Sequence, residues 1–470
     1  MKRKLLTSFL VMVMSLLTPL SVGACNKQTE SPASSSKEKE RFLIGSWVSY
    51  YDTKQEGCPS MSEQTKALSK AGINFIPVGS WILDVGEPIK HDVTSAEWWK
   101  HVDDVMAENG IYYNFSQNFD PNGNGNSHDE LVRAVELSNG SVSRAKTIVP
   151  QLKNCIGCML KDEPTYGAML DVGFWGEKYL KVVPDTKIYV NMNPGLIITA
   201  YGDVFDIKGP GGYKEFLQHW VDCGGAENLE FLSHDFYPFN ASDTMMSYFN
   251  DLEDMRYIGL KNNVKTHSFL QSCSWAGKRM PNIHELRWNA NTYLAYGFKG
   301  FSYFNWVMWD GEGCNDGIID MNGNIRNEAL YKELINMNWE IRDMEDIIMN
   351  LDCLHAYHTL NHADFNSVEL LPQGWVLQPN DSSADLIISH MQTKDTKEPY
   401  LVITNKSFTE AQTVTFKISP DSGIQSLARY NAKTKEYDEV QIINDCFTLS
   451  LDISEAAWLK ITGTNVAFPD

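Results

Sequence analysis

CIGCMLKDEP, residues 155–164, begins as an apolar run and ends in charged residues, and this change of character recurs along the chain. Eight such runs lie between residues 41 and 306, with first residues 31 to 44 positions apart. They are FLIGSW (42–47), INFIPV (73–78), IYYNF (111–115), CIGCML (155–160), KIYVN (187–191), LEFL (229–232), VKTHSFL (264–270) and FKGFSYF (298–304). Each interval is long enough for a strand, a crossover helix and two loops.

Amphipathic segments occupy several of these intervals. Residues 62–71, 96–109 and 284–296 place apolar side chains at helical spacing, and each segment is followed by a glycine suited to a helix stop. Eight strand-then-helix units predict an α/β fold, a (β/α)8 TIM barrel over residues 41–350. The rival is an open doubly wound sheet, but no glycine-rich phosphate turn follows the first strand.

The pattern changes beyond about residue 350. Residues 326–348 predict one long helix, and short alternating runs such as YLVIT (400–404) and VTFKI (414–418) follow it. Alternation between polar turns is typical of antiparallel strands. Residues 351–470 are therefore predicted to form a small C-terminal antiparallel β-sandwich that serves as an accessory domain.

The first residues have the features of an export signal. Lys2, Arg3 and Lys4 precede a mostly apolar stretch, and the small residues 22–24 lead to Cys25. The stretch is short for a membrane span and ends in a small-residue cleavage site. Residues 1–24 are thus predicted to be a lipoprotein signal peptide, with lipidation at Cys25. The alternative is an ordinary signal peptide with a chance cysteine.

The next segment is polar. Residues 26–40 contain no aromatic or large aliphatic side chain, so they cannot bury enough surface to fold. We expect residues 25–40 to be a flexible tether between the lipid and the barrel. The expected location is the cell envelope, on the periplasmic or surface face of the outer membrane, with membrane contact through the lipid anchor only.

Charge and cysteine usage narrow the possible partners. The net charge of −20 argues against nucleic acid and suits a neutral or cationic substrate. Eight cysteines besides Cys25 are irregularly spaced, unlike a disulfide framework. The CxxC pattern at 155–158 has no second CxxC or His pair and lies in an apolar strand, which indicates packing. Neither a metal nor a cofactor is predicted.

Catalytic residues of a TIM barrel lie at the C-terminal ends of its strands. Cleavage of a glycosidic bond needs a carboxylic acid for the leaving oxygen and a second carboxylate at the anomeric carbon. Glu163 follows the fourth strand, where partial burial would raise its pKa as an acid requires, and Asp235 follows the sixth. Asp162 is a third candidate, although an ion pair or a loop cap would also explain it.

Aromatic and amide side chains concentrate at the same predicted rim. Aromatic rings can cover the C–H faces of sugars, while amides bind hydroxyl groups. A single His on each of two strands, at 234 and 267, lacks metal-site spacing and indicates hydrogen bonding or packing. The predicted substrate-binding residues are Trp47, Trp81, Gln117, Asn193, Tyr237, Gln271, Trp275, Asn305 and Trp306.

Three motifs carry a family resemblance. LKDEP (160–164), HDFYP (234–238) and GFSYFNW (300–306) together resemble the glycoside hydrolase barrels of clan A. The similarity is nearest to family 42-like β-galactosidases and glycosidase-like lipoproteins of gut Bacteroidetes. It implies a TIM barrel with Glu163 as acid/base, although Asp162 stands where the clan usually has Asn. The clan's nucleophile is a Glu at the end of strand seven, where this chain has Gln271, and a neutral amide cannot attack an anomeric centre.

Three interpretations of that difference are open. Asp235 is the partner carboxylate, as nucleophile or as the base of an inverting enzyme. Alternatively, the pair Asp162–Glu163 resembles the Asp–Glu pair of family 20 hexosaminidases, in which the acetamido group of the substrate attacks. Finally, the barrel binds glycan without catalysis. The sequence favours a glycoside hydrolase acting on oligo- or polysaccharide, and the alternative is a non-catalytic glycan-binding lipoprotein.

Overall fold

The computed structural model describes residues 40–54, 56–115, 142–202, 209–308, 313–463, 466 and 468. The chain divides into two units, residues 1–40 and residues 41–470. The predicted signal peptide and Cys25 fall outside the described residues, as does Gln117.

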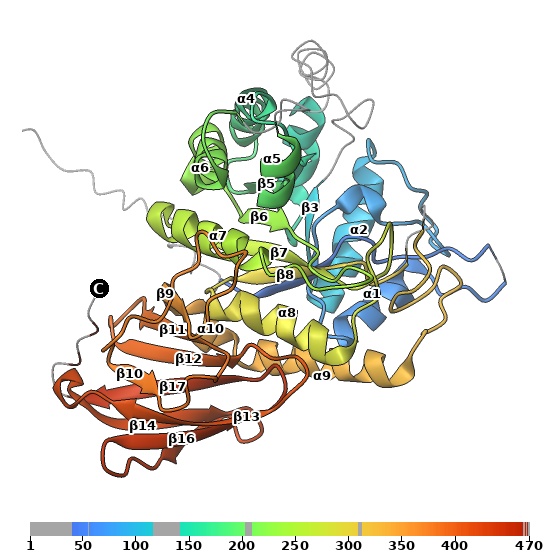
Figure 1. Cartoon of the computed structure of the whole chain (residues 1–470). Coiled ribbons are helices and arrows are strands. Elements are labelled where there is room, and N and C mark those ends of the chain that lie inside the picture. Colours follow the sequence, from blue (N-terminus) through green and yellow to red (C-terminus); the bar gives the residue numbers. More distant parts are fainter. Residues whose placement is uncertain are drawn as a thin grey trace, which may run out of the picture. The chain divides into compact units, whose positions relative to one another are not determined.

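Eight parallel strands form a closed barrel in the order of the sequence (Figure 1). Strand β1 pairs with β2 on one side and with β8 on the other, which closes the cylinder. The predicted TIM barrel is confirmed. Its strands are β1 (Leu43–Ser46), β2 (Phe75–Ile76), β3 (Tyr112–Phe115), β4 (Cys155–Asp162), β5 (Lys187–Met192), β6 (Leu232–Asp235), β7 (Thr266–Gln271) and β8 (Gly300–Phe304).

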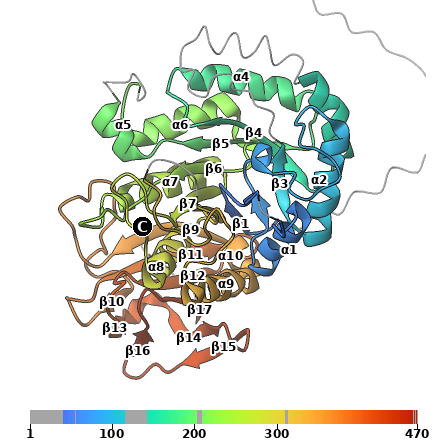
Figure 2. The same ribbon diagram turned by 90° about the vertical axis from the view of Figure 1, so that its right-hand side faces the viewer.

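Helices surround these strands, and Figure 2 shows α2, α4 and α6 outside β3 to β6. Local sequence sets where the helices begin and end. Ser60 and Glu63 form a capping box at the start of α1, and Gly110 ends α2 in the left-handed conformation. The helices are α1 (Met61–Lys70), α2 (Ala96–Asn109), α4 (Ala168–Leu180), α5 (Gly195–Tyr201), α6 (Tyr213–Gly224), α7 (Tyr248–Asn262), α8 (Ile283–Ala295), α9 (Glu328–Asp343) and α10 (Glu345–Met349).

Two predicted elements differ from the structure. The sixth strand begins at Leu232, and Leu229 makes only an isolated bridge to Ile188, so Asp235 ends the strand rather than following it. The predicted helix over residues 326–348 is two helices, because α9 ends at Asp343 and α10 begins at Glu345. Apolar periodicity continues across that break, so the pattern alone did not reveal it.

Aromatic side chains fill the lower part of the barrel. The ring of Phe75 on β2 lies 6.2 Å from that of Tyr189 on β5 and 6.5 Å from that of Phe231, just before β6. These strands are not neighbours of β2, so the contacts cross the interior. The interior is a packed core, and a site for a ligand has to lie above it, at the strand ends.

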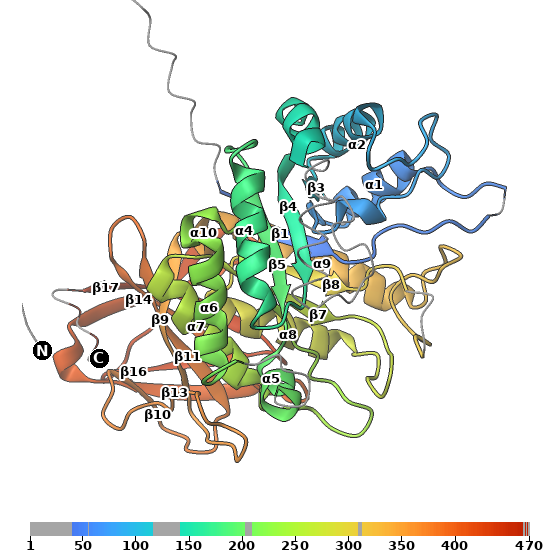
Figure 3. The ribbon, with the colours of Figure 1, turned by 90° about the horizontal axis from the view of Figure 1, so that it is seen from above.

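The C-terminal region forms two antiparallel sheets, as predicted. Figure 3 shows β13 and β16 beside the strands of the larger sheet. One apolar core joins the sheets and includes Phe416 and Phe447 from the smaller sheet with Leu401 and Leu459 from the larger. The sheets are β10 (Leu377–Pro379), β13 (Gln412–Ile418) and β16 (Cys446–Leu451), and β15 (Glu436–Val440), β14 (Ile424–Asn431), β17 (Ala456–Gly463), β12 (Pro399–Asn405), β11 (Leu386–Thr393) and β9 (Leu351–His358).

Buried polar contacts join the barrel to this β-sandwich. Lys299 Nζ donates to the carbonyl oxygen of Leu351 at the start of β9, and Trp288 Nε1 donates to that of Lys406 at 2.8 Å. Arg256 donates to the Cys353 carbonyl oxygen at 3.2 Å. The two domains therefore share a specific interface. Within the described part of the chain, no helix has the length and apolar character needed to cross a membrane.

Candidate active site

Strands β4 and β5 position the two adjacent acids, Asp162 and Glu163. Asp162 is paired with Asn191 in the parallel register, and Asn191 Nδ2 donates to Asp162 Oδ1 at 3.2 Å. Glu163 has a φ of 45°, which is uncommon for a residue other than glycine. The Glu163 amide donates to the Asn191 carbonyl oxygen at 2.8 Å, and Asn193 Nδ2 donates to the Glu163 carbonyl oxygen at 3.2 Å. The backbone of Glu163 is thus fixed on both sides.

Asp235 ends β6 and meets Glu163 side chain to side chain. Asp235 is 8% exposed, and its Oδ1 has no hydrogen-bond donor among the described residues. Two ionised carboxylates only accept hydrogen bonds, so one member of a touching pair must carry a proton. The interaction between Glu163 and Asp235 therefore favours a proton on one of the two acids.

The surroundings of these acids favour their protonated forms. Burial and then the Glu163 carboxylate raise the pKa of Asp235 well above its ordinary value. Burial likewise raises the pKa of Glu163, and it raises that of Asp162 to about 7, with the Glu163 charge as the second cause. The side chains of Asp162 and Glu163 still reach solvent, so an incoming substrate can contact them. A proton donor is available here near neutral pH.

A chain of hydrogen bonds beneath the acids holds Asn191 in place. Ser233 Oγ donates to Asn191 Oδ1 at 3.2 Å and lies 2.9 Å from His267 Nδ1. His267 Nε2 lies 3.0 Å from Ser302 Oγ, and the Tyr189 hydroxyl lies 3.0 Å from Ser233 Oγ. Burial lowers the pKa of His267 to about 3, so its ring is neutral. Hydrogen bonding at this histidine agrees with the sequence-based interpretation.

Aromatic rings flank the acids in two groups. Tyr237 packs against Trp275 and Phe304, with ring centroids 4.8 and 5.0 Å away, and its hydroxyl stabilises the charged form of Asp235. At β1, Trp47 lies 6.3 Å from Trp81, which is 44% exposed. Tyr237, Trp275 and Trp47 are partly exposed, so rings are present where a sugar could contact them.

Three of the predicted substrate contacts lie in the packed interior. Gln271 is fully buried. Its Oε1 accepts a hydrogen bond from the Phe239 amide, and its Nε2 donates to the carbonyl oxygens of Phe239 and Arg279. Asn305 is also fully buried and accepts from the Val48 amide at 3.2 Å. Trp306 is 2% exposed and packs against other rings. These side chains hold the loops above the barrel, because all three point into protein rather than toward solvent.

Some contributors to the site had no clear sequence signal. Ser233 and Ser302 are small polar residues inside apolar strands, and Phe304 and Tyr213 resemble ordinary core residues. Alternation along β6 could have placed Ser233 on the same inner face as Asp235. No cluster of three metal-ligating side chains is found within the described ranges.

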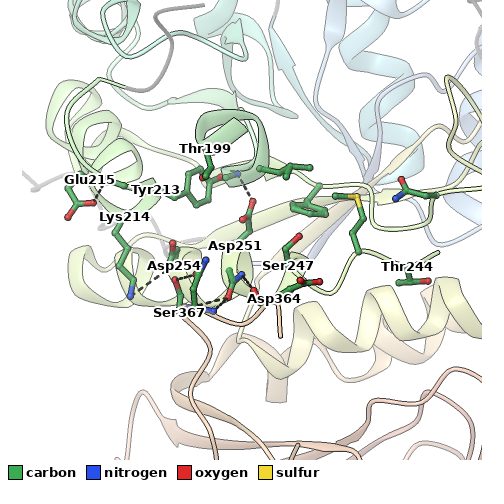
Figure 4. Close-up of a pocket in the computed structure, with 18 of the residues that line it drawn as sticks. Thr199, Tyr213, Lys214, Glu215, Thr244, Ser247, Asp251, Asp254, Asp364 and Ser367 are labelled. Carbon is green, nitrogen blue, oxygen red and sulfur yellow. Dashed lines mark hydrogen bonds and ion pairs between the residues drawn. The ribbon is translucent and has the colours of Figure 1, made fainter. Parts of the chain in front are cut away.

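A pocket of about 740 Å³ lies beside this site (Figure 4). Tyr213 in its wall donates to the Asn193 carbonyl oxygen at 2.9 Å, and Phe236 in its wall directly follows Asp235. Helices α5, α6 and α7 and the loop between β6 and α7 supply most of the lining, and the β-sandwich contributes Asp364, Asn366 and Ser367. The accessory domain thus contributes to a pocket next to the carboxyl groups.

Solved structures share this architecture. The beta-galactosidase from Bacillus circulans sp. alkalophilus superposes with a TM-score of 0.54 at 11% identity, over 90% of this chain and 99% of that chain. Gan42B, a GH42 beta-galactosidase from G. stearothermophilus, has a TM-score of 0.54 at 10% identity, over 90% and 98%.

An alpha-amylase from Geobacillus thermoleovorans has a TM-score of 0.51 at 12% identity, over 90% of this chain and 99% of that chain. No protein-family model matches the sequence, and no curated protein matches it. At such low identity the likeness establishes the fold, and the resemblance expected from the motifs is confirmed at that level.

Proposed function

We propose that this protein is a glycoside hydrolase with Glu163 as its general acid. The observation that carries the proposal is the convergence of Glu163, Asp235 and Asp162 at the C-terminal ends of β4 and β6. Raised pKa values keep a proton on this cluster near neutral pH, and a leaving glycosidic oxygen needs that proton. Structural neighbours that are themselves glycosidases support the same reaction class.

In this mechanism Glu163 protonates the leaving oxygen and Asp235 is the second carboxylate. Retaining enzymes hold their two carboxyl groups about 5–5.5 Å apart, and inverting enzymes hold them roughly 6.5–9.5 Å apart. The side chains of Glu163 and Asp235 interact in the free protein. Their spacing around a bound sugar decides whether Asp235 attacks the anomeric carbon or activates water. If Glu163 and Asp235 stay in contact when substrate binds, Asp235 only adjusts the pKa of Glu163. The alternative nucleophile is then the acetamido group of a substrate held by Asp162.

The proposed substrate is an oligo- or polysaccharide. Tyr237 and Trp275 on one side and Trp47 and Trp81 on the other provide rings for sugar faces. Three acids at the centre and a net charge of −20 disfavour anionic sugars. Asn193 positions the Glu163 backbone, which gives it an indirect part in binding.

The test is Glu163→Gln, compared with Glu177→Gln on the exposed surface of α4. The amide has the shape of the acid but no proton to donate, so we expect kcat to fall by about 10²–10⁴-fold while glycan binding persists. Glu177→Gln removes a charge from the same βα unit and should leave kcat within about twofold. Circular dichroism verifies folding of both variants, and full activity of Glu163→Gln would remove this residue from the mechanism.

A glycan-binding protein without catalysis is the second candidate, and the amide of Gln271 at the end of β7 favours it. Reducing-sugar release across a broad glycan panel, measured together with binding by calorimetry, separates the two. Binding without release on every glycan supports this candidate, whereas release that depends on Glu163 supports the hydrolase.

We also propose that Cys25 carries a lipid that anchors the protein in the cell envelope, because Cys25 directly follows the small residues 22–24. Cys25→Ser should move the protein from the membrane fraction to the soluble fraction after cell breakage. Retention of this variant in the membrane fraction would contradict the proposal.

A further inference from the structure

The pocket beside the proposed active site has the size and lining of a ligand site. Its volume of about 740 Å³ lies within the range of roughly 300–1,000 Å³ that is usual for small-molecule pockets. Hydroxyl and amide side chains line it from separate parts of the chain, and they are Thr199, Asn240, Thr244, Ser247, Asn366 and Ser367. Such groups donate and accept hydrogen bonds, so they suit a ligand with several hydroxyl groups.

Acidic residues outnumber basic residues in this lining. Lys214 is the only basic residue among the described residues that line the pocket, and the acidic ones are Glu215, Asp243, Asp251, Asp254 and Asp364. No three of these acids form a cluster that could hold a metal ion within the described ranges. An organic cation therefore fits this excess of negative charge better than a metal ion does.

Two of the acids lie buried on α7 in the pocket wall. Asp251 is 4% exposed, and its Oδ2 accepts from the Gly195 amide at 2.6 Å. Asp254 is 6% exposed, and its Oδ1 accepts no hydrogen bond from the described residues. Burial raises the pKa of both carboxyl groups, so a positive group placed beside them would stabilise their ionised forms.

The ion pair between Lys214 and Asp254 can be replaced by a ligand. Lys214 Nζ lies 3.4 Å from Asp254 Oδ1, and the lysine reaches it from α6 (Figure 4). The lysine side chain is 38% exposed and also lies over the Tyr257 ring, 5.0 Å from its centroid. An ion pair with a partly exposed lysine is weak, so a ligand that brings its own ammonium group can take the place of Lys214.

We propose that this pocket binds a sugar unit that carries a free, protonated amino group. The ammonium group pairs with Asp254, and the ring hydroxyls bond to the hydroxyl and amide side chains of the walls. Leu196 is exposed in the same lining and offers an apolar surface to the C–H face of the ring. A lysine-rich peptide would match the charge but would leave the hydroxyl and amide groups without partners.

This site is separate from the proposed active site. Neither Glu163 nor Asp235 is among the described residues that line the pocket. Binding there requires no turnover, so its failure and the failure of the hydrolase proposal are distinguishable.

The experiment is calorimetry of the full chain with a β-1,4-linked glucosamine trimer, at a pH of about 6 so that its amines are charged. The fully N-acetylated trimer is the neutral counterpart, and we expect it to bind at least about tenfold more weakly. Asp254→Asn should weaken binding of the glucosamine trimer by about tenfold or more, because it removes the charge from this contact. Asp222→Asn, an equal change at an exposed position of α6 outside the pocket, should alter the affinity by less than about twofold.

A second variant should change the affinity in the opposite direction. Lys214→Gln removes the competing ammonium group from Asp254, so it should tighten binding of the glucosamine trimer by about two- to fivefold. Lys214 is partly exposed, and this variant keeps the test valid even if Asp254→Asn folds poorly. Absence of binding, an unchanged affinity in Asp254→Asn, weaker binding in Lys214→Gln, or equally tight binding of trilysine would overturn the proposal.

Discussion

Asp162 is a carboxyl group whose ionisation differs between the folded and unfolded chain. Its pKa rises from 3.8 to about 7 on folding, chiefly through burial. The folded state therefore holds an extra proton between these values, and the stability that this proton confers is complete below about pH 4 and lost as pH rises through 7. Asp162→Asn should increase the free energy of unfolding at pH 8, by on the order of 1 kcal/mol, because the solvent that still reaches this carboxylate screens part of the cost of its charge. Urea unfolding at pH 4 and pH 8 measures the difference.

Asp222→Asn on α6 is the matched control, since Asp222 is exposed. It should change the free energy of unfolding by less than about 0.5 kcal/mol at both pH values. A loss of stability in Asp162→Asn at pH 8 would show that the ionised carboxylate is favourable there. At this scale the strand-end rule predicted that Glu163 and Asp235 lie at one rim of the barrel, but it gave no sign that Gln271 is bound to the backbone.

Strand β6 depends on a hydroxyl group at its centre. Ser233 Oγ contacts Asn191, His267 and Tyr189 within the barrel, and it is fully buried. Ser233→Ala would leave these groups without a partner, and an unsatisfied buried polar group costs about 1–3 kcal/mol. We expect a destabilisation in this range, measured by urea unfolding at constant pH.

Thr413→Ala on β13 removes a hydroxyl from an exposed position and should cost less than about 0.5 kcal/mol. Equal effects of the two substitutions would mean that the buried chain of hydrogen bonds contributes nothing to stability.

At the scale of elements, periodicity located every barrel strand to within a few residues. It misplaced the start of β6, because LEFL has the composition of a strand although only its last residue belongs to β6.

The two domains are connected at Asn250, a 7% exposed residue on α7. Its Oδ1 accepts from the amides of Asn366 and Ser367 at 2.8 and 3.1 Å, and its Nδ2 donates to the Asp364 carbonyl oxygen at 2.7 Å. Asn250→Ala would remove all three bonds and free this loop of the β-sandwich beside the pocket. We expect a loss of about 2 kcal/mol or more and faster proteolytic cleavage within residues 361–370.

Asn336→Ala, at an exposed position of α9, is the control and should leave stability and cleavage nearly unchanged. If Asn250→Ala behaves like this control, the loop is held by the surrounding apolar contacts instead.

At the scale of the molecule, the sequence predicted that the barrel comes first along the chain and the β-sandwich follows it. The contribution of the accessory domain to the pocket was not predictable, because Asn250 and Asp364 lie 114 residues apart.

Sequence alone determined which segments become strands and helices, and hence the barrel and the sandwich, because hydrophobic period and turn residues are local properties. It also determined the rim on which the acids lie. Tertiary structure decided which side chains meet there. Register between β4, β5 and β6 joins Asp162 to Asn191 and Asn191 to Ser233, and chain folding turns Trp306 and Asn305 inward. Such contacts depend on residues distant in sequence, so no local pattern encodes them.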